Sequence, residues 1–493
     1  MQEAGLGSPT AEIPLTFSFR DPGGALFADK GRIFRIVNSA GTADMSAFLS
    51  SPAAARWTSS GAVVRTTILD VGTKTELLRD ERIGSLFSAI HGDLILEHER
   101  IAFPSFPYEW PPEMLHAAAG LTLDLALDLL ADGFGLKDAT PYNILFRGPQ
   151  PVFIDVLSFE RRDPGDPAWL PYAQFVRTFL LPLLASRQFG VTIEQSLFSR
   201  RDGLEPEEVY RWLGAAQRFR PPFLSLVSMP TWLARKHDQD DASIYRKKVL
   251  SDPERARFIL RSLLKGLKRK LQSLEPRATA SAWTGYMDSN NNYTAAHFAA
   301  KDRFTQELLA QHPPKAVLDV GCNTGHFSLL AARSGARVVS IDYDPAVLGG
   351  LWRKACDEKL NILPLAVNLT RPTPGVGWQN REWPSFLDRA RGAFDMVFML
   401  AVIHHMLVTE RVPLNEIIDQ AAALTTDFLL IEFVGPEDSM FRRLTRGREE
   451  LHRDLTPELF EASCRRHFDI VRSQHVEGAS RWLYWMRRRA RPS

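Results

Sequence analysis

The chain has little cysteine, and its cysteines show no paired spacing. Only Cys322, Cys356 and Cys464 occur among 493 residues. Disulfide frameworks and zinc sites need cysteines at short recurring spacings, so the sequence argues against both and favours a reducing compartment. The acid-rich run His237 to Asp241 is typical of a solvated loop, and we predict no metal site there or elsewhere.

The chain also lacks an excess of charge of one sign. Its 60 basic residues face 58 acidic ones, so no net field attracts nucleic acid or a membrane surface. Basic runs at 261–270 and 487–491 are typical of solvated helix faces or tails, and nucleic-acid binding is not expected. The start has no basic region followed by an apolar core, and the apolar segment 179–185 is too short to span a bilayer. We expect a cytoplasmic protein without a membrane span.

One turn in the second half of the chain carries most of the chemical information. Residues 316–325 read Ala-Val-Leu-Asp-Val-Gly-Cys-Asn-Thr-Gly, an apolar strand entering a turn. Gly321 and Gly325 allow the backbone to turn sharply and approach a ligand. A dinucleotide loop has Gly-x-Gly-x-x-Gly, whereas here Asp319 precedes a sparser pattern, which indicates a loop facing an amino-acid ammonium group. The ligand indicated is S-adenosylmethionine, with Asp319, Gly321, Asn323 and Gly325 as contacts.

The strands that follow this turn supply the remaining cofactor candidates. Residues 337–342 form a β-branched strand ending in Asp342, where an open α/β sheet places its ribose-binding carboxylate. Residues 361–368 read as a third strand ending in Asn368, whose amide suits the adenine edge. Further strands at 394–401 and 427–434 and a hairpin of 467–475 with 481–487 bring the number to seven.

With these features in place, residues 283–487 resemble a class I S-adenosylmethionine-dependent methyltransferase. That family has a Rossmann-like α/β sheet of seven mostly parallel strands, the last antiparallel. Four short stretches resemble more specifically a bacterial branch of two-part methyltransferases, some of which carry a nodulation-protein label: 401–405, 412–414, 431–434 and 481–484. Asn323 stands where many members have a second glycine, and Asn368 where many have Asp.

At 493 residues the chain is too long for a single core, and the N-terminal half predicts a separate α+β domain. Alternating residues over 15–37 predict a small antiparallel sheet, and 113–131 have helical spacing. A hairpin around Gly148-Pro149 and helices at 172–185 and 254–274 complete the expected elements. We predict an N-terminal domain at 1–277, a linker at 278–292 and the methyltransferase domain at 293–493.

The spacing of Asp138, Asn143 and Asp155 resembles the catalytic loop and metal-binding Asp of protein kinases and aminoglycoside-phosphotransferase-like enzymes. The resemblance covers roughly 15–270. It implies that the first Asp accepts a hydroxyl proton while Asn143 and Asp155 hold magnesium, with Mg-ATP as cofactor if the domain is active. Leu136 replaces the usual His, and no convincing third-strand Lys is present. The alternative is that Asp138 caps a loop and Asn143 starts a hairpin.

His404 and His405 follow the fourth predicted strand, at the sheet edge where ligands bind. A histidine there is a candidate base for removing the acceptor proton, and Glu432 on the fifth strand is a weaker one. The alternative is that one histidine caps the following helix and the other packs in the core. The aromatic residues Trp283, Tyr286 and Tyr293 suit either a lid or interdomain packing.

The sequence therefore predicts methyl transfer to an unidentified acceptor, for which a carbohydrate or small metabolite is the first guess. One alternative is a bifunctional kinase and methyltransferase. Another is an N-terminal scaffold that recruits the methyltransferase to a protein partner. An active kinase needs ATP and magnesium, whereas a scaffold needs neither.

Overall fold

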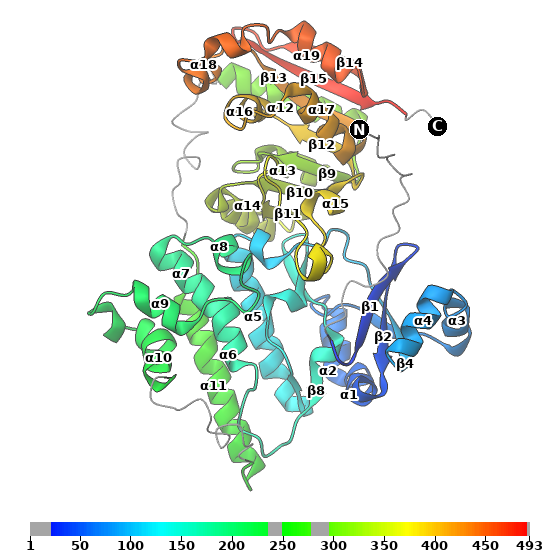
Figure 1. Cartoon of the computed structure of the whole chain (residues 1–493), viewed down its shortest axis with the longest axis vertical. Coiled ribbons are helices and arrows are strands. Elements are labelled where there is room, and N and C mark those ends of the chain that lie inside the picture. Colours follow the sequence, from blue (N-terminus) through cyan, green and yellow to red (C-terminus); the bar gives the residue numbers. More distant parts are fainter. Residues whose placement is uncertain (1–20, 235–248, 278–294, 491–493) are drawn as a thin grey trace, which may run out of the picture.

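The computed structural model describes residues 21–234, 249–277 and 295–490. An N-terminal part, 21–277, packs against a C-terminal part, 295–490 (Figure 1). The features expected at His237 to Asp241, Trp283, Tyr286 and Tyr293 lie outside the described residues.

The C-terminal part is built on one seven-stranded sheet. Its order is β11-β10-β9-β12-β13-β15-β14. The strands are β9 (Ala316–Val320), β10 (Arg337–Asp342), β11 (Ile362–Ala366), β12 (Phe394–Met399), β13 (Thr425–Val434), β14 (Phe468–His475) and β15 (Arg481–Arg488). The first five are parallel, and β15 runs antiparallel to both its neighbours. The seven predicted strands and their mostly parallel arrangement are confirmed.

Helices alternate with these strands because each parallel strand needs a crossover. They are α12 (Ala295–Gln311), α13 (His326–Arg333), α14 (Pro345–Asp357), α15 (Phe386–Ala390), α16 (Ile403–Val408), α17 (Leu414–Leu424), α18 (Ser439–Thr445) and α19 (Pro457–Cys464). The start of α14 follows from local chemistry, since Asp344 accepts from the backbone N–H of Ala346 at 2.9 Å and Pro345 occupies the first turn.

The N-terminal part begins with a four-stranded antiparallel sheet of order β1-β2-β4-β3. Its strands are β1 (Gly24–Asp29), β2 (Arg32–Asn38), β3 (Thr66–Ile68) and β4 (Gly92–His98). The turn joining β1 to β2 has positive φ at both Lys30 (46°) and Gly31 (79°), the geometry that favours a tight hairpin. This hairpin lies within the antiparallel sheet that the alternating residues over 15–37 predict.

The rest of the N-terminal part is mostly helical. Its longest helices, α5 (Pro112–Leu129) and α11 (Pro253–Ser273), pack against each other. The hairpin of β6 (Ile144–Arg147) and β7 (Gln150–Phe153) turns at Gly148 as predicted, while β5 (Phe134–Leu136) pairs with β8 (Phe159–Arg161). The loop 137–143 between β5 and β6 contains no strand.

The helix predicted at 113–131 is present as α5 and its short extension. Within the described residues, the helical segment Pro112–Asp132 alone is long and apolar enough to cross a membrane, judged by length and composition. Of its most apolar window, 61% is buried inside the protein. Its apolar residues therefore contribute to the core of the N-terminal part.

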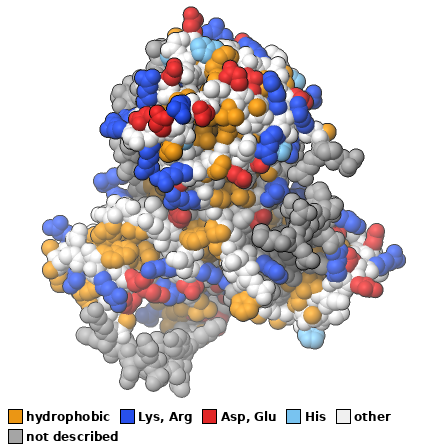
Figure 2. Space-filling view, turned by 45° about the horizontal axis from the view of Figure 1, so that its top comes forward, with side chains coloured by type: hydrophobic (Ala, Val, Ile, Leu, Met, Phe, Trp, Pro, Cys, Tyr) orange, Lys and Arg blue, Asp and Glu red, His pale blue; other side chains and the backbone are white. Residues whose placement is uncertain are grey.

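A single hydrophobic cluster includes residues of both parts. The ring of Phe103 lies 6.0 Å from that of Phe386 and 5.7 Å from that of Phe394, measured between centroids. On the face drawn in Figure 2, basic and acidic side chains are interspersed.

Candidate active site

The turn between β9 and α13 has the backbone that its glycines allow. Gly321, Asn323 and Gly325 have φ values of 69°, 50° and 80°. A Cβ on Gly325 would lie 2.3 Å from Leu351 of α14, so this position has no room for a side chain. Asparagine is among the residues that tolerate positive φ, which explains how Asn323 replaces a glycine.

Two acids hold this turn in place from opposite sides. Asp342 accepts from the backbone N–H groups of Asn323 at 2.9 Å and Asp344 at 3.0 Å. Burial raises the pKa of Asp342, and these two N–H groups oppose the rise. Asp319 instead accepts from the Ser328 hydroxyl of α13 at 2.5 Å, and burial raises its pKa to about 6. Asp342 therefore supports the turn, while Asp319 ties β9 to the helix.

Asn368 lies just beyond β11, at the same edge of the sheet as the ends of β9 and β10. Its side-chain carbonyl accepts from both the backbone N–H and the hydroxyl of Thr370, at 3.0 and 2.6 Å. The amide N–H₂ is then the end directed to other acceptors, such as a ring nitrogen of adenine. Because β9, β10 and β11 are adjacent and parallel, the turn, Asp342 and Asn368 meet at one sheet edge.

The histidine pair lies in α16, directly after β12, and its ring centroids are 4.2 Å apart. His404 is only 2% exposed, and neither of its ring nitrogens has a hydrogen-bond partner within the described residues. Burial lowers the pKa of His404 well below its usual value, and His405, Arg481 and Lys301 add to the shift. The pKa of His405 is also lowered, mainly by burial. His404 is thus a neutral imidazole at neutral pH.

Beside His404 lies a chain of buried ion pairs, here called the ion quartet: Lys301, Glu432, Arg481 and Asp438. Glu432 lies 2.6 Å from Lys301 and 3.1 Å from Arg481, and Arg481 pairs with Asp438 at 2.7 Å. Burial favours a higher pKa for Glu432, but Lys301 and Arg481 outweigh it and the net shift is downward. Glu432 is therefore an ionised carboxylate with cations on both oxygens.

Of the quartet, the sequence singled out only Glu432. Lys301 gave no signal, because a lysine in a helix is ordinarily exposed, whereas this one is 4% exposed. Arg481 is the first residue of a predicted strand. A charged residue at the start of an apolar strand is the feature of the sequence that could have indicated a buried ion pair.

The N-terminal part contains a second group of buried polar residues around Asp155. Arg35 of β2 lies 3.1 Å from Asp155 and 2.9 Å from Asp21. Burial raises the pKa of Asp155, Arg35 opposes the rise, and the nearby carboxylates of Asp21 and Asp138 add to it. Asp138 accepts from Gln174 at 3.2 Å. Asp138 and Asp155 thus lie close enough to interact.

This group does not fit the magnesium that the kinase resemblance implies. Asp155, the expected metal ligand, already faces the permanent positive charge of Arg35. The side-chain nitrogen of Asn143 is buried and has no hydrogen-bond partner among the described residues. Within the ranges that the structure describes, no group of three or more His, Cys, Asp or Glu residues is placed to hold a metal ion. The sequence analysis did not identify Arg35 as a site residue, although Arg35 is the only charged residue between Ile33 and Val37.

Comparison with known proteins agrees with the C-terminal geometry. Residues 293–479 match the family model described as a methyltransferase domain. The nodulation protein NoeA of Rhizobium meliloti (strain 1021) is 32% identical over 478 residues, which cover 96% of this chain and 95% of that protein.

Two solved structures show weaker likeness. The N-methyltransferase NodS from Bradyrhizobium japonicum WM9, in complex with S-adenosyl-L-homocysteine, is 16% identical over 44% of this chain and 97% of its own, with a TM-score of 0.31. The bifunctional kinase-methyltransferase WbdD is 17% identical over 41% of each chain, with a TM-score of 0.30. At such scores neither adds to what the strand order shows.

The strand order, the turn after β9 and the family match together define a class I S-adenosylmethionine-dependent methyltransferase. The similarity to NoeA, by contrast, spans both parts of the chain. The chain belongs to the same family as NoeA.

Proposed function

We propose that the chain transfers the methyl group of S-adenosylmethionine to a hydroxyl or amine of a small metabolite or carbohydrate. The observation that carries this is His404, which is buried beside the carboxyl end of β12 with neither ring nitrogen bonded to a described residue. A neutral imidazole has one donor and one acceptor. A hydroxyl or amine can satisfy both.

The residues proposed to form the cofactor site are Asp319, Gly321, Asn323, Gly325, Asp342 and Asn368. Asp342 binds the ribose hydroxyls and Asn368 the adenine. Asp319 acts through Ser328, to which it is bonded, by fixing the position of the turn. These residues would hold S-adenosylmethionine at the edge of the sheet where α16 also begins, and its alignment with the acceptor would supply much of the rate.

In the proposed reaction the bond between sulfur and methyl breaks as the bond from the acceptor oxygen or nitrogen to the methyl forms. S-Adenosylhomocysteine leaves, and the acceptor proton passes to His404 and then to solvent. His404 is a weak base, but the acceptor becomes strongly acidic as it gains the methyl cation, so a weak base suffices. His405 supports the His404 ring, and Glu432 holds the site through the ion quartet.

We propose further that residues 1–277 form an accessory domain, 278–292 a linker and 293–493 the methyltransferase domain. The start of the family match at residue 293 supports this division. The Arg35–Asp155 pair favours an accessory domain without magnesium over a bifunctional kinase. A rise in the melting temperature of the purified chain on addition of Mg-ATP would instead support the bifunctional kinase and methyltransferase.

The cofactor assignment is tested by calorimetry with S-adenosylhomocysteine. Asp342→Ala removes charge-assisted bonds to the ribose, and we expect binding to weaken by about 1 to 3 kcal/mol. Equal affinity of wild type and variant for S-adenosylhomocysteine would show that Asp342 does not bind the ribose. The acceptor is found by incubating fractionated metabolite and glycan extracts with labelled S-adenosylmethionine and following the label.

A further inference from the structure

The segment that joins β11 to β12 begins at the proposed adenine contact and then leaves the sheet. Asn368 starts it, and α15 ends it. Over its middle, Val376 and Trp383 form an isolated bridge, so the segment has little regular structure of its own. Several of its residues are instead held by contacts with the N-terminal part, and we call each such place of contact a fixed point.

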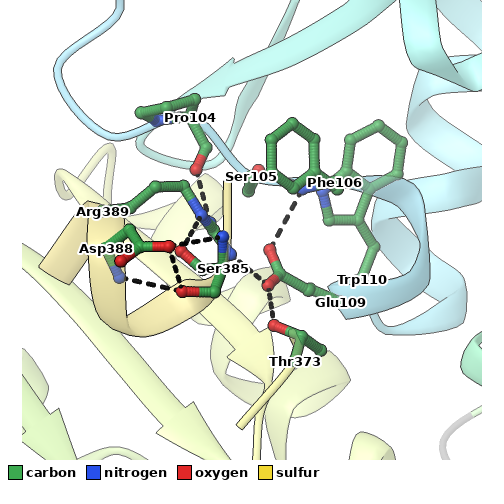
Figure 3. A network of polar contacts seen from close by, with 9 residues as sticks. All are labelled: Pro104, Ser105, Phe106, Glu109, Trp110, Thr373, Ser385, Asp388 and Arg389. Carbon is green, nitrogen blue, oxygen red and sulfur yellow. Dashed lines mark hydrogen bonds and ion pairs between the residues drawn. The ribbon is translucent and has the colours of Figure 1, made fainter. Parts of the chain in front are cut away.

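The first fixed point is Glu109, a carboxylate with 0% exposure in the N-terminal part (Figure 3). It accepts from the Thr373 hydroxyl at 2.5 Å and pairs with Arg389 of α15. Arg389 also donates to the backbone carbonyl of Pro104 at 2.7 Å and lies 4.8 Å from the centre of the Phe106 ring. Both ends of the segment beyond Asn368 are thereby tied to residues 104–109.

The second fixed point is Trp383, in the middle of the segment. Its ring centroid lies 5.2 Å from that of Tyr142, and Arg201 lies 5.2 Å from the Trp383 ring centre. Tyr142 belongs to the loop that carries Asp138 and Asn143. The loop with the kinase-like spacing therefore touches the segment that leads from the proposed adenine contact.

The third fixed point is α14, which follows the proposed ribose contact Asp342. Arg353 pairs with Glu113 at 2.6 Å, and the indole N–H of Trp352 donates to the carbonyl of Pro149 at 3.0 Å. Gly349 faces Glu113 so closely that a Cβ there would lie 2.2 Å from its carboxylate. The elements on both sides of the proposed adenosine site thus rest on the N-terminal part.

We propose that the N-terminal part sets the affinity for S-adenosylmethionine by holding the segment 368–390, with Glu109 and its partner Thr373 as positioning residues. This inference rests on the proposed cofactor site. Since coupling between sites is reciprocal, cofactor binding must in turn stabilise the contacts around Glu109. Neither residue touches the cofactor; both act through the segment that carries Asn368.

The test uses the full chain, S-adenosylhomocysteine and calorimetry. Thr373→Val removes the bond to Glu109 but keeps the side-chain shape, and we expect the dissociation constant to rise about 5- to 150-fold. Thr373→Ser keeps the hydroxyl and is expected to restore wild-type affinity. Thr122→Val is the matched control, because Thr122 is an equally buried threonine of α5 whose hydroxyl bonds only its own helix, and it should change nothing.

Hydrogen exchange of the wild type provides a second measurement that needs no variant to fold. S-Adenosylhomocysteine is expected to slow exchange in 104–110 and 373–390 as well as in the turn at 319–325. Protection confined to 319–345, or unchanged affinity in a folded Thr373→Val variant, overturns the inference and leaves the cofactor site intact. Failure of the wild type to bind S-adenosylhomocysteine overturns the proposed site itself.

Discussion

Among the described residues, His98 in the N-terminal part and His404 in the C-terminal part are the buried histidines, each near an arginine, and they differ in what their ring nitrogens contact. His98 of β4 is 6% exposed, and its Nδ1 lies 2.8 Å from the Thr66 hydroxyl. His404 is 2% exposed, and neither nitrogen has a partner within the described residues. Burial lowers the pKa of both. A buried histidine can therefore be part of the framework or be reserved for a ligand, and the pKa alone does not distinguish the two.

The surroundings of the two histidines differ in charge as well. Around His404 the two cations of the ion quartet are matched by two carboxylates. Near His98 a single cation, Arg35, faces Asp21 and Asp155, with Asp138 close by. His404 is neutral mainly because it is buried, and the cations Arg481 and Lys301 of the quartet lower its pKa further, which suits proton transfer. In the other group, Arg35 is committed to two carboxylates.

The largest expected effect separates the two histidines by activity. His404→Ala should lower turnover by about two to four orders of magnitude, because the proton acceptor is lost. Its affinity for S-adenosylhomocysteine should be unchanged. His98→Ala is the matched control and should retain turnover within a few-fold in steady-state assays with the identified acceptor. Normal turnover of His404→Ala would return that residue to a packing role.

The second effect concerns the ion quartet. Glu432→Gln leaves Lys301 and Arg481 buried without their carboxylate, and we expect a loss of about 3 to 5 kcal/mol in the free energy of unfolding. Urea denaturation measures it. Glu307→Gln is the control, since its pair with Arg472 is about 40% exposed and should contribute less than about 1 kcal/mol. Similar losses in both variants would mean that burial of the quartet has no special importance.

The third effect is a dependence of stability on pH that His98 predicts. Burial and Arg35 lower its pKa from 6.5 to about 3 in the folded chain. Below pH 6.5 the unfolded chain binds a proton that the folded chain does not, so stability falls as the pH falls. Between pH 7 and pH 5 this loss amounts to about 2 kcal/mol. His404 adds a loss of the same sign.

His98→Gln isolates this contribution. Its free energy of unfolding, measured by urea denaturation at each pH, should fall by about 2 kcal/mol less than that of the wild type over the same interval. Equal pH dependence of variant and wild type would show that His98 is not held neutral by its surroundings.

The smallest expected effect comes from a substitution that makes the surroundings of His98 more like those of His404. Thr66→Val removes the hydroxyl that partners His98, leaving both of its ring nitrogens without a hydrogen bond. We expect a loss of about 1 kcal/mol in unfolding free energy and no change in methyl transfer. A change in turnover, measured with the same acceptor assay, would show that the N-terminal histidine also serves the reaction.

The sequence predicted the C-terminal fold well because buried parallel strands appear as short apolar runs. Residues 316–320 and 337–342 are such runs. The first is followed directly by Gly321 and the second ends at Asp342, and both of these residues belong to the proposed cofactor site. Asn323 was noted as a departure, and its positive φ shows why it is tolerated. These features are local, so periodicity and turn chemistry reveal them.

The remaining features depend on contacts between distant residues. Glu109 lies in the sequence Phe-Pro-Tyr-Glu-Trp-Pro-Pro, which is rich in aromatic residues and proline. Nothing in this local sequence indicates that Glu109 pairs with Arg389. Lys301 and Arg35 look like surface residues until the fold buries them. The kinase-like spacing singled out Asp138 and Asp155, and Asp138 lies close enough to raise the pKa of Asp155. The spacing gave no sign that an arginine faces the Asp155 carboxylate.

The pairing of Glu109 with Arg389 also has a consequence for how the chain is made. The two residues are 280 positions apart, and at ribosomal rates of 5 to 20 residues per second that gap takes roughly 15 to 55 s to synthesise. Throughout this time a nascent N-terminal part has Glu109 without its cation and Phe103 without the rings of Phe386 and Phe394. The contacts between the two parts can therefore form only after the segment beyond β11 has left the ribosome.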